Sequence, residues 1–116
     1  MSINSREKGK RAERALAKKL REYGFTDCRR TQQYCGANGD ADVVGLPDIH
    51  IECKHVERLD IWKAVSQAKS DSREGEYPCV FHKKNNTEWL VTMPLENWIE
   101  LYRAYYFEVK NDTRLP

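Results

Sequence analysis

The alternation between helical and strand-like hydrophobic periods is the feature that most constrains the fold of this chain. Apolar residues recur at intervals of three and four in residues 5–23 and again in residues 60–73, as they do in helices with one buried face. Short alternating or β-branched runs predict strands at residues 26–33, 41–46, 49–54, 77–83 and 88–93. A last helix is expected from Pro94 to about residue 107. This order predicts an α/β fold with a mixed central sheet flanked by helices.

Length and hydropathy limit the class of protein. A chain of 116 residues supports one hydrophobic core, so we expect a single domain over residues 1–116. No apolar run approaches the roughly 20 residues that span a bilayer. The polar N-terminus does not resemble a secretory signal, so we expect a cytoplasmic protein that has no membrane partner. We therefore expect its four cysteines to be reduced and mostly buried, and its three tryptophans to pack in the core.

Charge is distributed unevenly along the chain. Residues 1–30 carry ten basic and four acidic side chains, whereas residues 31–116 carry ten basic and fourteen acidic ones. Such a basic segment on an acidic body indicates a polyanionic partner such as nucleic acid, although solvated helix faces produce the same imbalance. The side chains that we expect to contact phosphate groups are Lys8, Lys10, Arg11, Arg29, Arg30 and, in the Gly- and Asn-containing loop that follows, Tyr34.

The segment from residue 49 to residue 54 carries the chemistry of interest. Side chains alternate across a strand, so Glu52 and Lys54 share one face with His50. An acid and a base at this spacing suit catalysis, but they equally suit an ordinary ion pair on a solvent-exposed face.

Two carboxylates meet only if the strands pair in one register. With a turn at residues 46–48, Asp42 stands opposite Glu52, with Cβ atoms ~5 Å apart, and both carboxylates can hold one divalent cation. A shift of one residue would place them on opposite faces. Asp48 lies ~13 Å from Glu52 along an extended strand, so we assign it to the turn. A contribution from Asp40 or Asp48 stays open.

Glu13 and Gln67 extend this group. Glu13 shares the apolar face of the first helix with Leu16 and Leu20, a costly position for an acid unless it is paired, binds a metal or bends out to water. Gln67, on the second helix, can hydrogen-bond an attacking water or Lys54, although it can equally be a surface glutamine. Carboxylates that hold Mg²⁺ beside a lysine are suited to phosphodiester hydrolysis.

The set of Glu13, Asp42 and the run Glu52-Cys53-Lys54, with a glutamine on the following helix, resembles the PD-(D/E)XK nuclease superfamily. Within it, the chain is similar to archaeal-type Holliday junction resolvases and phage VRR-NUC-type nucleases. The resemblance implies a restriction-endonuclease-like αβββαβ core and a site that binds Mg²⁺, or Mn²⁺ as a substitute. Asp42, Glu52 and the backbone carbonyl of Cys53 would bind the metal, and Glu13 would act through water or a second ion. Lys54 would be the catalytic lysine.

The resemblance implies a structure-specific DNA endonuclease, expected above all to resolve four-way junctions in recombination and repair. Such resolvases are homodimers, because a junction needs two symmetric cuts, and a short nuclease of this type suits a phage. Two alternatives stay open: a nuclease of linear, nicked or flapped DNA, of repair, replication or restriction type, and a non-catalytic nucleic-acid-binding module.

Overall fold

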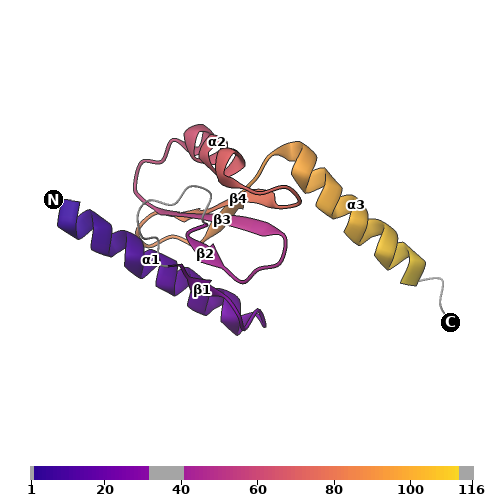
Figure 1. Cartoon of the computed structure of the whole chain (residues 1–116), viewed down its shortest axis with the longest axis horizontal. Coiled ribbons are helices and arrows are strands. Elements are labelled where there is room, and N and C mark those ends of the chain that lie inside the picture. The colour runs from indigo at the N-terminus through magenta and orange to yellow at the C-terminus, as the bar shows by residue number, and fades with distance from the viewer. Residues whose placement is uncertain (1, 32–40, 113–116) are drawn as a thin grey trace.

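A mixed five-stranded sheet forms the centre of the molecule (Figure 1). The computed structural model describes the backbone of residues 2–31 and 41–112, and the side chains of residues 5–31 and 41–108. The elements in chain order are α1 (Ser2–Glu22), β1 (Arg29–Arg30), β2 (Val43–Val44), β3 (Ile49–His55), α2 (Ile61–Asp71), β4 (Tyr77–Lys83), β5 (Leu90–Thr92) and α3 (Leu95–Asp112). The predicted α/β class and the order of elements are confirmed.

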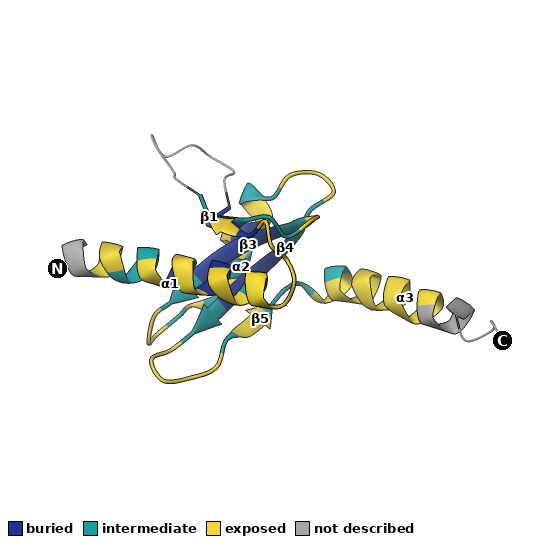
Figure 2. Cartoon of the chain, turned by 90° about the horizontal axis from the view of Figure 1, so that it is seen from below, coloured by how far each residue is buried: buried dark blue, intermediate teal, exposed yellow. Residues whose placement is uncertain are grey.

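The strands lie in the order β1-β2-β3-β4-β5, and only β3 and β4 run parallel. Parallel neighbours need a crossover connection, which α2 supplies. α1 and α2 cover opposite faces of the sheet, because α1 packs into a cluster with Ile51 and Cys53, whereas α2 packs against Val80. The buried residues concentrate in the two parallel strands between these helices (Figure 2).

The helices dock through the apolar stripes that the sequence displays. Leu16 and Ala17 of α1 are almost fully buried, and Ala64 and Ala68 of α2 allow close approach to the sheet. Asp60 caps α2, since its Oδ1 accepts a hydrogen bond from the backbone N–H of Lys63 at 3.1 Å.

The turn between β2 and β3 sets the register that the site needs. Val43 pairs with Ile51, and the backbone N–H of Asp42 donates to the carbonyl of Ile51 at 3.0 Å. This register places Asp42 opposite Glu52, as the turn length predicts. Gly45 adopts a φ of 106°, and a Cβ there would lie 2.6 Å from the Cα of Cys28, so the turn fits tightly against the chain before β1.

Three expectations from the sequence need correction or a limit. β1 and β2 are shorter than the predicted strands, although part of residues 26–33 lies outside the described structure. The expected burial of the tryptophans is wrong for Trp62 and Trp98, which are 82% and 48% exposed. Cys28, Cys53 and Cys79 are buried free thiols, as expected, and burial raises the pKa of Cys79 to about 11; Cys35 lies outside the described residues.

The last helix, α3, differs from the other two in its relation to the sheet. It begins after Pro94, whose carbonyl accepts a hydrogen bond from the N–H of Trp98 at 3.0 Å. From there it projects away from the sheet instead of covering one of its faces (Figures 1 and 2). Among the described residues, no helix combines the length and the apolarity needed to cross a membrane.

Candidate active site

A cavity of about 400 Å³ lies beside the N-terminal half of α1 and the second half of β3. Its walls bring together four residues singled out in the sequence: Glu13, Asp42, Glu52 and Lys54. Gly9 also lines the cavity, and a Cβ at this position would meet nothing within 4 Å, so α1 leaves space in front of the carboxylates. The four residues are therefore arranged around one open volume.

Asp42 is held in place from the strand opposite. Its Oδ2 accepts a hydrogen bond from the backbone N–H of Cys53 at 2.8 Å. Burial, and then the charge of Glu52, raise the pKa of Asp42 to about 6, although the bond from Cys53 and the charge of Lys54 oppose this rise. The charges of Glu52 and Glu13 thus raise the pKa of Asp42 more than the charge of Lys54 lowers it. A bound divalent cation would stabilise both carboxylates in their ionised form.

Glu52 is 7% exposed and lies against His50, which is only 1% exposed. The Nε2 of His50 lies 3.2 Å from Glu52 Oε1, and its Nδ1 lies 3.8 Å from Glu76 Oε1. Burial lowers the pKa of His50, but the hydrogen bond with Glu52 and the nearby carboxylates, including Asp71, together raise it above the ordinary value. The imidazole therefore fixes the orientation of Glu52 from the side opposite α1.

Glu52 also belongs to a second group of potential ligands. His50, Glu52 and Asp71 each offer one ligand atom, and these atoms lie within 4.8 Å of one another. Mg²⁺ prefers oxygen ligands, whereas imidazole suits transition metals, so a group that includes His50 is less suited to Mg²⁺ than one made of carboxylates alone. The sequence places His50 on the same face as Glu52. It gives no indication that Asp71 and Glu76 also approach His50, because these two residues lie at the end of α2 and in the segment that follows it.

Glu13 is paired with a residue that the sequence assigned to phosphate binding. The Nε of Arg30 donates to Glu13 Oε1 at 2.7 Å, and both side chains are largely buried, with 23% and 20% of their surface exposed. This ion pair explains how an acid is tolerated on the apolar face of α1. In this structure Arg30 is engaged with the site rather than displayed at the surface.

Lys54 lines the carboxylate cavity and also a neighbouring one of about 260 Å³, which Gln67 lines as well. Gln67 is exposed, and its Nε2 donates to Asp71 Oδ2 at 2.7 Å, one turn further along α2. The helix therefore brings Gln67 near Lys54, but its amide is directed toward Asp71.

The basic residues occupy the surroundings of the cavity to different degrees. Lys8 lines it directly, and Lys8 and Arg11 also line an adjoining cavity of about 430 Å³. Lys83, which the sequence did not indicate, lines this adjoining cavity as well.

The other residues proposed from the sequence lie outside these cavities or outside the described structure. The Nζ of Lys10 lies 3.8 Å from Glu7 Oε2 on the same helix. Arg29 is exposed on β1, and Asp48 lies in the turn, as expected. Tyr34 and Asp40 fall outside the described residues.

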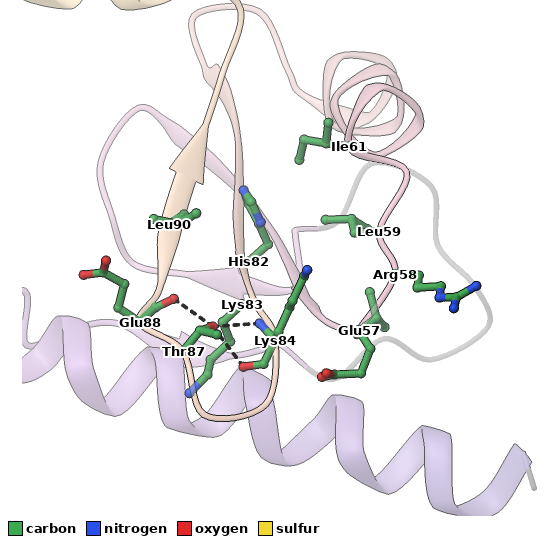
Figure 3. Close-up of a pocket in the computed structure, with 11 residues that line it drawn as sticks. Glu57, Arg58, Leu59, Ile61, His82, Lys83, Lys84, Thr87, Glu88 and Leu90 are labelled. Carbon is green, nitrogen blue, oxygen red and sulfur yellow. Dashed lines mark hydrogen bonds between the residues drawn. The ribbon is translucent and has the colours of Figure 1, made fainter.

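The largest of the cavities described, about 730 Å³, adjoins the carboxylate cavity and shares Val56 and Glu57 with it. Figure 3 shows its two sides: Lys83 and Lys84 come from the β4–β5 hairpin, and Glu57 and Arg58 from the segment before α2. The backbone N–H of Asn85 donates to Glu57 Oε2 at 2.6 Å, which ties the two sides together. A partly basic surface thus continues from the carboxylates.

Comparison with known proteins gives one match. The model of a family described as "phage putative PDDEXK endonuclease" matches residues 4–114. No curated protein and no solved structure matches the chain. The matched range contains every element of the sheet and all four residues around the cavity. Because the match extends over nearly the whole sequence, the chain belongs to the phage PDDEXK endonuclease family.

Proposed function

We propose that this nuclease is a Mg²⁺-dependent endodeoxyribonuclease that cuts branched DNA, with the four-way junction as its preferred substrate. The observation that carries the proposal is the cavity in which Glu13, Asp42, Glu52 and Lys54 meet. Carboxylates beside a lysine suit phosphodiester hydrolysis, and neither a surface ion pair nor a purely structural role requires this grouping.

The donor set supports a hard divalent cation. Asp42 and Glu52, with the backbone carbonyl of Cys53, would hold Mg²⁺ or Mn²⁺, and Glu13 would act through water or a second ion. Bound there, the metal would polarise the scissile phosphate and lower the pKa of the attacking water. The raised pKa of Asp42 supports this assignment, because burial first and the charge of Glu52 second disfavour the ionised carboxylate, which a bound cation would favour.

The chain's own side chains would orient the substrate and offset charge. Lys54 would orient the attacking water or stabilise the charge that develops on the phosphate. Arg30 holds Glu13, and the backbone N–H of Cys53 holds Asp42, so two of the carboxylates keep their orientation without substrate. Gln67 would assist by hydrogen-bonding the water or Lys54 once its amide turns from Asp71.

The expected substrate follows from the charge around the cavity. Lys8, Lys10, Arg11 and Arg29, together with Tyr34, would contact phosphate groups, and Lys83 and Lys84 would extend this contact along the adjoining cavity. Such contacts do not discriminate between bases, so the shape of the DNA would provide selectivity. Two symmetric cuts in a junction need two active sites, and we therefore propose a homodimer. It would act in recombination or repair of phage DNA in the host cytoplasm.

The experiment is cleavage of a labelled four-way junction beside linear, nicked and flapped duplexes of matched sequence, in Mg²⁺, Mn²⁺ and EDTA. Paired symmetric cuts in the junction, lost in EDTA, are the expected result. Cutting of the other substrates with equal efficiency would contradict junction specificity. No cutting in either metal would contradict the enzymatic assignment and favour a DNA-binding module.

Matched variants connect the activity with the cavity. Lys54→Ala and Glu52→Gln should abolish cleavage while leaving DNA binding nearly intact. Lys69→Ala and Glu74→Gln change the same residue types at exposed positions and should have no effect. Cleavage at the wild-type rate by Lys54→Ala or Glu52→Gln would refute the site assignment.

A further inference from the structure

The projecting helix α3 carries an unusual concentration of exposed apolar side chains. Every large apolar residue of its described part, residues 95–108, is at least 36% exposed. These residues are Leu95, Trp98, Ile99, Leu101, Tyr102, Tyr105, Tyr106 and Phe107. Figure 2 shows α3 mostly exposed, with an intermediate part in its first turn, and separate from the buried strands. Glu100 of α3 shares a side-chain hydrogen bond with Tyr77 of β4. Helices in proteins are stabilised mainly by the packing of an apolar face, so the exposed apolar face of α3 is suited to a partner surface.

The aromatic residues form an ordered ridge. The rings of Trp98 and Tyr102 stack with centroids 5.3 Å apart and an interplanar angle of 6°. Tyr102 continues the row to Tyr106, with centroids 6.2 Å apart, and contacts Tyr105 at 6.1 Å. Side chains spaced by four residues form the ridges that pack into the grooves of a second helix. The surface therefore has the form of a helix-packing interface.

Charge on α3 disfavours nucleic acid and anionic membranes as the partner. The described part of the helix carries the acidic residues Glu96, Glu100 and Glu108 and one basic residue, Arg103. A polyanion would be repelled by this excess of carboxylates. An apolar protein surface is the chemistry that remains.

The exposed area agrees with a pair of such helices. Full burial of an aromatic side chain removes ~150–250 Å² from water, so the four ridge aromatics, which are 41–61% exposed, leave roughly 300–500 Å² per helix. Two copies supply about 600–1,000 Å², and the exposed aliphatic residues extend this toward the lower end of the ~1,200–2,000 Å² of specific interfaces. In a two-fold symmetric contact the same patch of both copies meets, so the ridge of one copy would pack beside the ridge of the other.

We infer that α3 is the dimerisation helix of this nuclease: two copies pair through the ridge of Trp98, Tyr102, Tyr105 and Tyr106. The inference rests on the homodimer of the proposed function and adds the surface that forms it. The carboxylate cavity lies beside the N-terminal half of α1, away from α3 in Figure 1, so pairing through α3 leaves both active sites accessible to DNA.

Sedimentation equilibrium of the full chain over micromolar concentrations tests the inference. The wild type should be a dimer, and Tyr102→Glu should weaken association at least 100-fold, because each copy would place a charge in the middle of the interface. Tyr102→Phe should remain a dimer. Trp62→Glu, which introduces the same charge at an 82% exposed tryptophan on α2, should also remain a dimer. A monomeric wild type, or a dimer that Tyr102→Glu leaves unchanged, would overturn the inference.

Cleavage assays separate this inference from the proposed function. Tyr102→Glu, with the wild-type circular dichroism spectrum, should still nick single strands in Mg²⁺ but lose the paired cuts in a junction. Glu52→Gln should lose cleavage and remain a dimer. Absence of cleavage by a dimeric wild type contradicts the nuclease proposal and leaves the dimerisation helix standing. Efficient cleavage by a monomeric wild type contradicts the dimerisation helix and the homodimer, and leaves the proposed nuclease activity standing.

Discussion

Replacing Asp42 with asparagine should stabilise the metal-free fold at neutral pH while it abolishes activity. The side chain of Asp42 is half-buried and shares the cavity with Glu52 and Glu13. The asparagine side chain would keep an oxygen that can accept the hydrogen bond from the N–H of Cys53. The substitution therefore removes the charge with little change in shape or hydrogen bonding.

The magnitude follows from the pKa of Asp42, which burial and the charge of Glu52 raise from 3.8 to about 6. A shift of about 2 units corresponds to at most ~3 kcal/mol, so we expect the free energy of unfolding to increase by about 1–3 kcal/mol. Between pH 4 and pH 6 the folded protein keeps a proton that the unfolded chain has released. The stability of the wild type therefore falls as pH rises through this window, and the variant lacks this decrease.

Urea unfolding in EDTA at pH 7.5 and at pH 3.5 measures the effect. Asp42→Asn should increase the free energy of unfolding at pH 7.5 and have little effect at pH 3.5, where Asp42 is largely protonated in both states. Asp27→Asn, at an exposed aspartate, serves as the control. An unchanged or lower stability at pH 7.5, or the same gain at both pH values, would refute the electrostatic explanation. Mg²⁺ should stabilise the wild type and not Asp42→Asn.

Three further predictions concern the support of the site, the turn and the basic surface. His50→Leu should weaken Mn²⁺ binding ~10-fold in calorimetry, because the carboxylate of Glu52 loses the hydrogen-bond donor that orients it. His50→Gln should restore most of the affinity, and equal affinities for the two variants would contradict this role. Gly45→Ala should lose more than ~2 kcal/mol in urea unfolding, because it combines a left-handed φ with a collision; Gly24→Ala, where φ is also positive but space is open, should lose about 1 kcal/mol. Lys8→Ala with Arg11→Ala should lower the salt dependence of DNA binding by about two phosphate contacts; an unchanged slope would place the DNA on another face.

The register of β2 and β3 shows how far local reasoning extends. Strand alternation and the length of the turn at residues 46–48 suffice to place Asp42 opposite Glu52, because both are properties of a short continuous segment. The apolar stripes of α1 and α2 likewise identify the faces that dock on the sheet. The roles of these residues in metal binding and catalysis stay predictions.

Contacts between distant segments lay beyond that reasoning. The pairs His50–Glu76 and Glu13–Arg30 join residues whose partners are chosen by the packing of separate elements, and no period within one element reports them. The expected burial of Trp62 and Trp98 failed for the same reason. An apolar stripe on a helix indicates that one face of the helix is suited to burial, but it does not indicate which other surface packs against that face.

The sequence by itself determined the order of helices and strands and the α/β class, and it predicted that Asp42 faces Glu52 for a turn at residues 46–48, because each of these depends on periodicity and turn length along a continuous stretch. Only the tertiary structure decided that His50 lies beside Glu76, that Arg30 holds Glu13 and that α3 leaves the domain with its aromatic face exposed. These features depend on how segments far apart in the chain pack against one another, and such packing is fixed only when the whole domain folds.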